Sequence, residues 1–241
     1  TDNCNLWIHN LDLFYGKPGS AADQKKGDGT LDIKGDSKYC TMSYNHLWDS
    51  GKASLCGMTS ESGPNYITYH HNWFDHSDSR HPRIRTMSVH IYNNYFDGNS
   101  KYGVGAAKAS DAFVENNYFR SCKYPMLISK QGSDVNNGTG SAAETKGTFS
   151  GEDGGIIKAI GNVIEGARKY QKWTESGINN THFDAYEVAN KSDKVPSSVK
   201  ALQGGHVYNN FDTDASLMYS GYTCHAGSKV KDVVTGEYGA G

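Results

Sequence analysis

Short runs in which apolar and polar residues alternate recur along the chain, and most of them close on an asparagine. The two clearest runs are ITYHHNWF at 67–74 and VHIYNNYF at 89–96, which share one pattern of apolar positions. Successive side chains of an extended strand point to opposite faces, so each run predicts a short strand with one buried face. The likeness of the two runs indicates an internal repeat.

The repeat continues on both sides of these runs, with the asparagine as its anchor. The first four anchors are spaced by 27, 22 and 23 residues, and the spacing then rises to 45 and 48. In the first five copies, the residues five and three positions before the anchor and two positions after it are apolar or small. The anchors are Asn45, Asn72, Asn94, Asn117 and Asn162, with a shortened copy at Asn210.

A strand of this kind cannot bury its inner face alone, so copies at nearly equal spacing predict coils stacked around one continuous core. We therefore predict an all-β fold, a right-handed parallel β-helix (solenoid), with the anchor asparagines stacked in an amide ladder at one corner. A β-sandwich is disfavoured because three apolar columns recur in register with the asparagines. The longer spacings indicate large loops or further coils that the pattern does not reveal.

The stacked coils are expected to form a single domain over 1–241, since they share one core. The first residues already form a strand repeat, which predicts that this is the C-terminal portion of a longer catalytic domain, without its N-terminal coils. Loops rich in small and polar residues are expected at about 130–155 and 165–203. A final coil and a tail are expected from Tyr208 to Gly241.

The composition fits a packed protein rather than a disordered one. A mean hydropathy of −0.68 and 36% hydrophobic residues would suit disorder, but 16 Tyr, 8 Phe and 4 Trp argue against it. The net charge of −2 gives no overall field that would attract nucleic acid, so any basic site is local. No apolar run reaches the length of a membrane span. We expect a monomer that binds neither nucleic acid nor a membrane.

The five cysteines lack the close spacing of a metal site. Cys40 falls in an apolar column, which predicts a small core residue. Whether the other four, Cys4, Cys56, Cys122 and Cys224, pair with one another stays open at this point.

An acidic segment precedes the first complete repeat. Asp28 and Asp32 flank Gly-Thr-Leu, and Lys34 follows two residues later. In an extended segment these three side chains point to the same side. Grouped carboxylates are the hard oxygen ligands that Ca²⁺ prefers, whereas a solvated strand face with an Asp–Lys pair is the alternative for this segment alone.

A basic loop lies between the two clearest strand runs. Arg80, Arg83 and Arg85 fall within six residues, and Lys52 lies in a turn of the preceding coil. Planar guanidinium groups suit carboxylates and phosphates. Because stacked coils lie about 4.8 Å apart, we expect these cations and the acidic segment to share one outer face. This predicts a mixed site for a divalent cation and a carboxylate-bearing polyanion. The alternative is an arginine cluster paired with Asp75, Asp78 and Asp97.

Three segments together carry a family resemblance: DGTLDIKGDSKYCTMSYNHLWDSGKASLCG, NYITYHHNWFDHSDSRHPRIR and VHIYNNYF. They closely resemble the pectate lyases of the parallel β-helix pectate lyase superfamily, and the resemblance extends from residue 1 to about 125. It implies a secreted enzyme that uses Ca²⁺ to cleave α-1,4-linked polygalacturonate (pectate) by β-elimination. The products would be 4,5-unsaturated oligogalacturonates.

Carried over by position, the resemblance also implies roles for individual residues. Arg80 would be the base that removes the C5 proton of the sugar. Neighbouring cations would favour the neutral guanidine that this role requires. The other implied roles are Ca²⁺ ligation by Asp28 and Asp32, contact with a substrate carboxylate by Lys34, and uronate binding by Lys52 and Arg85.

The chain also departs from the family pattern. The family's Asp-Gly-Asp before the first strand is absent, and Trp7-Ile8-His9-Asn10 stands where the family has Trp-Ile-Asp-His. Three other functions stay open. A polygalacturonase-like hydrolase would require paired acidic groups where this chain has a cationic loop, and a pectin lyase would not need the acidic segment. A non-catalytic β-helix that binds polyuronate is the third.

Overall fold

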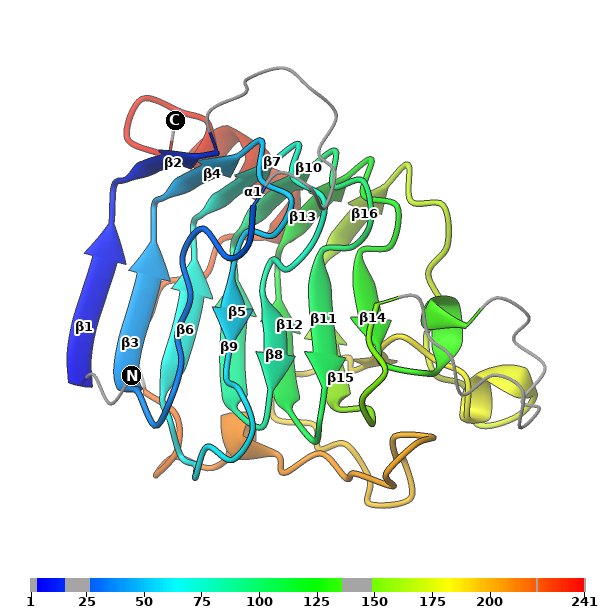
Figure 1. The fold of residues 1–241 in the computed structure, drawn as a ribbon. Coiled ribbons are helices and arrows are strands. Elements are labelled where there is room, and N and C mark those ends of the chain that lie inside the picture. The colour runs from blue at the N-terminus through cyan, green and yellow to red at the C-terminus, as the bar shows by residue number, and fades with distance from the viewer. Residues whose placement is uncertain (1–3, 16–26, 136–148, 220, 241) are drawn as a thin grey trace.

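The computed structural model describes residues 4–15, 27–135, 149–219 and 221–240, and within these ranges the chain winds into a parallel β-helix of three sheets (Figure 1). Every pairing between named strands is parallel, and each strand pairs with its counterpart on a neighbouring coil. The parallel β-helix predicted from the repeat is thus confirmed. The part of the predicted loop at 136–148 lies outside the described residues.

Sheets A, B and C are named here in order of decreasing size. Sheet A has seven strands, in the order β1 (Cys4–His9), β3 (Lys38–Ser43), β6 (Ile67–His70), β9 (Ser88–Tyr92), β12 (Asp111–Glu115), β15 (Ile156–Ile160) and β17 (Tyr186–Glu187). Sheet B has six, β16 (Val163–Glu165), β13 (Tyr118–Arg120), β10 (Tyr95–Asp97), β7 (Trp73–Asp75), β4 (His46–Trp48) and β2 (Asp12–Phe14). Sheet C has four, β14 (Met126–Ile128), β11 (Val104–Ala107), β8 (Arg83–Arg85) and β5 (Leu55–Cys56).

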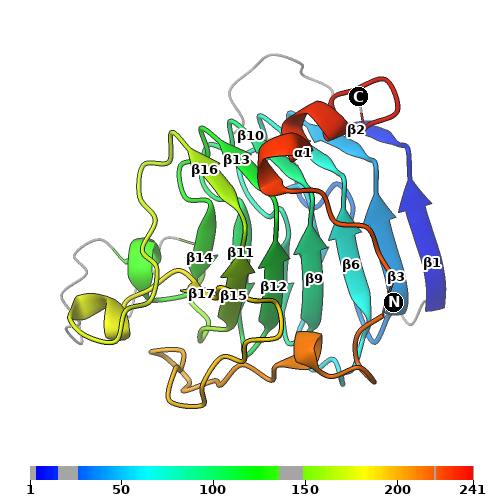
Figure 2. The ribbon, with the colours of Figure 1, turned by 180° about the vertical axis from the view of Figure 1, so that it is seen from behind.

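Sheets C and A lie on opposite faces of the coil stack. Sheet C faces the viewer in Figure 1, and sheet A faces the viewer after the half-turn to Figure 2. Side chains that point outward from these two sheets therefore form separate surfaces.

The corner between sheets A and B holds the predicted asparagine ladder. Each of the first four anchors donates a hydrogen bond from Nδ2 to Oδ1 of the anchor on the next coil, at 2.9 to 3.0 Å. The backbone N–H of the same four anchors donates to the same oxygen. The ladder residues are Asn45, Asn72, Asn94, Asn117 and Asn162. The prediction for Asn210 is wrong, because its Oδ1 instead accepts from the backbone N–H of Val195 at 2.8 Å.

The residue before each anchor makes the corner possible. It has a positive φ of 48° to 64° on all five coils, in the left-handed region. A tight corner needs this conformation, which is costly for most residues and easiest for glycine and asparagine. The residues in this position are Tyr44, His71, Asn93, Asn116 and Gly161.

The apolar columns of the repeat form the core. Phe74, Phe96 and Phe119 stack on successive coils, with ring centroids 5.1 and 4.3 Å apart, and each is fully buried. Burial of one such side chain stabilises the fold by about 1.5 to 3 kcal/mol. Cys40 is buried as predicted. Cys56, Cys122 and Cys224 are free thiols, so no disulfide joins these three.

Besides strands β15, β16 and β17, the described chain after β14 forms short 3₁₀ helices and one α-helix. The short 3₁₀ helices are η1 (Gly132–Asp134), η3 (Ile178–Asn180) and η4 (Phe211–Thr213). The segments 214–219 and 221–226, here called the C-terminal strap, cross the outer face of sheet A to α1 (Gly227–Val234) (Figure 2). The prediction of a final coil is wrong, because the described residues from 208 onward contain η4 and α1 but no named strand.

Helix α1 covers sheet B. Its Val230 and Val234 are fully buried against Tyr95 of β10. The sequence pattern did not predict this helix. No helix in the described ranges is long and apolar enough to cross a membrane.

Candidate active site

The outer face of sheet C collects the basic side chains of the loop around β8. In β8, Ile84 is fully buried in the core, so strand alternation turns Arg83 and Arg85 to the outside. Arg80 lies just before the strand. Its φ of 67° is unusual for a residue other than glycine and is the kind of local strain that is frequent at functional sites.

Three successive coils bring the predicted residues together. Lys52 pairs with Ser79 in an isolated parallel bridge, and the backbone of Thr30 donates to the carbonyl of Ala53 at 2.9 Å. At the surface, Oδ1 of Asp28 lies 3.2 Å from Nζ of Lys52 and 3.2 Å from Nη1 of Arg80. One carboxylate oxygen therefore joins two cations from two later coils.

The environment of Asp28 keeps its carboxylate ionised. The hydrogen bond from Lys52 lowers the pKa of Asp28 below its ordinary value, and the positive charges of Arg80 and Lys34 act in the same direction. The side chain is 77% exposed, so it is accessible to a metal ion or a ligand.

Asp32 is held more tightly than Asp28. Its Oδ1 accepts the backbone N–H of Leu55 at 2.8 Å, and its Oδ2 lies 3.0 Å from Nζ of Lys34. A Cβ on Gly29 would lie 2.2 Å from this Oδ2, so the carboxylate folds back over the backbone next to Asp28. The segment forms no named strand and has an isolated β-bridge at Ile33, so the extended geometry assumed from the sequence is not what groups these residues.

His81 follows Arg80 in the chain and adds no positive charge to the site at neutral pH. It is fully buried, and its Nδ1 lies 2.8 Å from the carbonyl oxygen of Tyr102. Burial lowers the pKa of His81 to about 4. The local positive charge therefore comes from the lysine and arginine side chains.

Glu152, which the sequence did not single out, contacts two of the arginines. Its Oε2 accepts from Nη2 of Arg83 at 2.8 Å and from Nε of Arg85 at 2.7 Å. Burial raises the pKa of Glu152, but the hydrogen bonds and charges of the two arginines outweigh it and hold the pKa below its ordinary value. The residue belongs to the predicted loop at 130–155, which carries no repeat signal.

The alternative partners of the arginine cluster lie elsewhere. Asp97 pairs with Arg120 at 2.7 Å, and Asp75 contacts His46 and His76. Ser100 donates to Asp78 at 3.0 Å. The interpretation of the arginine cluster as a partner of Asp75 and Asp97 is therefore wrong.

Asp75, His76 and Asp97 form the one group of three possible metal ligands found in the described part of the chain. They belong to sheet B or its end, not to the face that carries Asp28. The charge of Asp97 is already matched, since Arg120 binds it through two nitrogens at 2.7 and 2.8 Å. This group differs from the calcium ligands predicted from the sequence.

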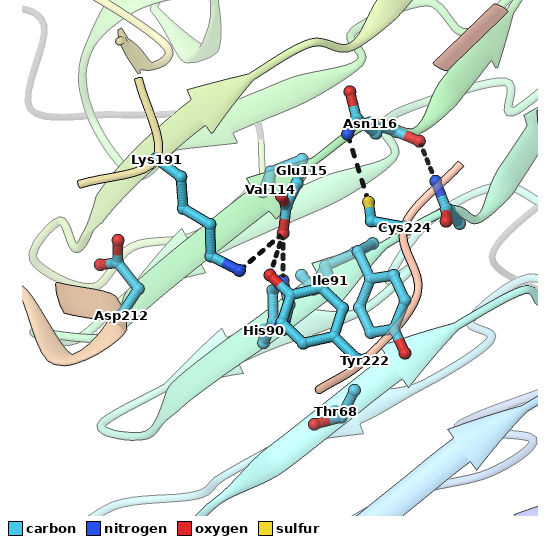
Figure 3. A network of polar contacts seen from close by, with 12 residues as sticks. Thr68, His90, Ile91, Val114, Glu115, Asn116, Lys191, Asp212, Tyr222 and Cys224 are labelled. Carbon is cyan, nitrogen blue, oxygen red and sulfur yellow. Dashed lines mark hydrogen bonds and ion pairs between the residues drawn. The ribbon is translucent and has the colours of Figure 1, made fainter. Parts of the chain in front are cut away.

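A second polar network lies on the outer face of sheet A (Figure 3). Oε2 of Glu115 accepts from Nε2 of His90 at 3.0 Å and from the hydroxyl of Tyr222 at 2.5 Å, and it lies 3.8 Å from Nζ of Lys191. The hydroxyl of Tyr219 also lies 2.8 Å from Nδ1 of His90. Since both tyrosines belong to the C-terminal strap, the network anchors the strap and is separate from the cationic site.

A family profile and two curated relatives that match this sequence are described as pectate lyases or as a pectate trisaccharide-lyase. A family profile described as pectate lyase matches residues 1–151. A pectate trisaccharide-lyase from Bacillus licheniformis is 35% identical over 124 residues, which cover 51% of this chain and 36% of that protein. A pectate lyase from Bacillus subtilis is 31% identical over 182 residues, which cover 68% and 39%. The chain thus spans less than two fifths of the length of these curated relatives.

Solved structures agree on the fold. Pectate lyase II from Xanthomonas campestris superposes with a TM-score of 0.58 at 24% identity, covering 95% of this chain and 57% of that one. A Bacillus pectate lyase in complex with trigalacturonate superposes with a TM-score of 0.56 at 22% identity, covering 96% and 58%. At these identities the superpositions establish the β-helix alone.

Proposed function

Since the chain belongs to the pectate lyase family, whose profile matches residues 1–151, we propose that it cleaves α-1,4-linked polygalacturonate by β-elimination and releases 4,5-unsaturated oligogalacturonates. One observation carries the proposal. Lys52 and Arg80 meet at Asp28 on the outer face that also presents Arg85, all within the matched segment. A solved relative is described as a complex with trigalacturonate, which supports the substrate class.

The chemistry demands cations next to a base. Elimination removes the C5 proton beside a carboxylate that is already ionised. The negative charge that develops at C5 is therefore next to an existing negative charge, which is unfavourable. Lys52 and Arg85 would bind the uronate and offset that charge, since preorganised cations act most strongly on charge that develops in the transition state. Lys34, 3.0 Å from Asp32, would contact a neighbouring substrate carboxylate.

Arg80 is the proposed base. Its side chain is 15% exposed and projects to Asp28 at the surface, where a substrate sugar has access. A base must lie within hydrogen-bond reach of the proton that it removes.

The acidic residues fit a calcium ion. Asp28 and Asp32 offer hard carboxylate oxygens, and the approach of Asp32 to Gly29 leaves no room for a side chain between them. They would hold Ca²⁺ together with substrate carboxylates. When bound, the ion would draw negative charge from the uronate and make its C5 proton more acidic.

The proposal extends to the setting of the enzyme. Polymeric pectate lies outside cells, so we infer that the protein is secreted and acts there as a monomer on polygalacturonate.

The competing hydrolase is less well supported. Inverting and retaining glycosidases use two carboxyl groups with distinct acid and base roles. On this face the candidate carboxylates Asp28, Asp32 and Glu152 are each paired with lysine or arginine. A binding protein without activity would use the same cations, and experiment distinguishes it.

One assay separates these functions. The protein is incubated with de-esterified polygalacturonate, with Ca²⁺ or with a chelator, and the ultraviolet absorbance of the unsaturated product is followed. Absorbance that depends on Ca²⁺ supports the lyase. New reducing ends without absorbance would indicate a hydrolase, and binding without any product would indicate a binding protein. Cleavage of esterified pectin that persists with the chelator would indicate a pectin lyase.

A further inference from the structure

We propose that Glu152 is a positioning residue that clamps the guanidinium of Arg85 through Nε, so that the outer edge of the same guanidinium faces the substrate uronate. The inference rests on the proposed function, because it assigns Arg85 to substrate binding. It concerns a residue outside the segment matched by the family profile, which ends at residue 151.

The loop that carries Glu152 is built into the sheet. The hydroxyl of Ser129 donates to the carbonyl oxygen of Glu152 at 2.7 Å, and the backbone N–H of Glu152 donates to Oγ of Ser150 at 3.1 Å. On its far side, Gly154 forms an antiparallel bridge with Ala107 of β11. These contacts fix the backbone of Glu152 on both sides, so its carboxylate has a defined place over sheet C.

Arg83 holds the carboxylate from below. Arg83 is 9% exposed, and its guanidinium carbon lies 5.4 Å from the ring centroid of Phe149. Its Nη2 donates to Oγ of Ser150 at 3.0 Å and to Oε2 of Glu152 at 2.8 Å. A buried guanidinium needs a counter-charge, and within the described residues the acidic partner of Arg83 is Glu152. Displacement of Glu152 by substrate would leave Arg83 buried without that partner. The carboxylate of Glu152 is therefore a fixed part of the site, and a substrate carboxylate does not displace it from Arg83.

Arg85 is fixed by the same oxygen but remains accessible. Its Nε donates to Oε2 of Glu152 at 2.7 Å. In the described part of the chain, this is the hydrogen bond that its side chain makes, which leaves Nη1 and Nη2 for a ligand. Guanidinium donors form a rigid planar fork, so fixing Nε also fixes the direction of the two Nη groups. A carboxylate can then bind bidentately without reordering the side chain.

A matched control lies one residue away. Asp153 carries the same charge and is 60% exposed, and its ion-pair partner is Lys130 at 3.9 Å rather than an arginine. Removal of either carboxylate changes the net charge by the same amount. A general electrostatic effect on a polyanionic substrate would therefore appear in both variants, whereas a clamp on Arg85 would appear in Glu152→Gln alone.

The kinetic experiment compares wild type, Glu152→Gln and Asp153→Asn on polygalacturonate. We expect kcat to fall about tenfold or more in Glu152→Gln, because misplacement of a substrate-binding group degrades the reacting geometry. KM should rise in Glu152→Gln, because a guanidinium that Glu152 no longer holds must be ordered by the substrate on binding. Asp153→Asn should keep the wild-type kcat. A kcat in Glu152→Gln within twofold of wild type, or an equal loss in both variants, would overturn the clamp.

A second measurement needs no turnover. The Nε–H proton of Arg85, assigned in nitrogen-15 spectra by its absence in Arg85→Lys, should exchange slowly with water in the wild type and rapidly in Glu152→Gln. Rapid exchange in the wild type itself would overturn the clamp even if Glu152→Gln fails to fold. A wild type that neither cleaves nor binds polygalacturonate would reject the proposed function, and slow exchange would still support the clamp.

Discussion

Arg80 reaches back across 52 residues of sequence to donate a hydrogen bond from Nη1 to Oδ1 of Asp28, at 3.2 Å. The two residues come from different coils, so the contact depends on the stacking of the β-helix. The pair joins the proposed base to the proposed metal ligand, and each partner can be removed separately.

Replacement of Arg80 by lysine tests the base. Arg80→Lys keeps a positive charge but changes the position and basicity of the reacting nitrogen, so we expect the elimination rate to fall by at least about a hundredfold. Binding of polygalacturonate should stay within about twofold, because Lys52 and Arg85 remain in place. The rate is measured from product absorbance and the binding by calorimetry. Arg168→Lys, at an exposed arginine outside the site, is the control. A near-normal rate in Arg80→Lys would reject the base assignment.

Replacement of Asp28 tests the metal ligand. Asp28→Asn removes one of the two proposed protein carboxylates, so the Ca²⁺ concentration needed for half-maximal rate should rise about tenfold or more. The variant also loses the counter-charge of Lys52 and Arg80. A calcium titration of the elimination rate makes the measurement, and Asp232→Asn in the exposed part of α1 is the matched control. An unchanged calcium requirement would remove Asp28 from the metal site.

The amide ladder predicts a large effect on stability. Nδ2 of Asn94 donates to Asn117 at 3.0 Å and to the carbonyl oxygen of Tyr69 at 2.9 Å, and its Oδ1 accepts from Asn72. Asn94→Ala leaves these buried groups unpaired, and each costs about 1 to 3 kcal/mol, so the free energy of unfolding should fall by roughly 3 kcal/mol or more.

Denaturant unfolding measures the loss. Asn190→Ala, at an exposed asparagine outside the ladder, should change the free energy of unfolding by less than about 0.5 kcal/mol. Equal stabilities of the two variants would mean that the ladder contributes little.

The sequence was informative where the repeat fixes the register. Once coils of 22 to 27 residues were recognised between Asn45 and Asn117, the positions of Asp28, Lys52 and Arg80 relative to one another followed from stacking alone. The prediction required no knowledge of the loops, because residues at equivalent places in successive coils must lie close together.

The sequence was uninformative where contacts come from irregular segments. Glu152 binds Arg85 across 67 residues, from a loop without apolar periodicity. Helix α1 is only eight residues long, and it is stabilised by burial of Val230 and Val234 against sheet B rather than by its own sequence pattern. Asn210 fitted the anchor pattern, but its Oδ1 accepts from the backbone of Val195, and the chain continues into η4 instead of a strand.

Buried histidines predict how stability depends on pH. Burial lowers the pKa of His81 to about 4, and it lowers the pKa of His70 to about 4 and of His71 to about 3. An unfolded chain takes up a proton on each histidine below about pH 6.5, whereas the folded protein does not until much lower pH. Each neutral histidine therefore contributes fully to the free energy of unfolding above pH 6.5. This contribution is lost as the pH falls toward the folded-state pKa of about 4.

The variant His81→Gln isolates one of these groups. Glutamine does not titrate, so the stability difference between wild type and His81→Gln should shrink by about 2 kcal/mol between pH 7 and pH 5. His70 and His71 remain in both proteins and cancel in the difference. Denaturant unfolding at the two pH values makes the measurement, with His9→Gln at an exposed histidine as control. A stability difference between the two proteins that stays constant over this range would contradict the prediction. It would mean that His81 takes up its proton equally in the folded and unfolded chain, and that His81 carries charge in the folded protein at mildly acidic pH.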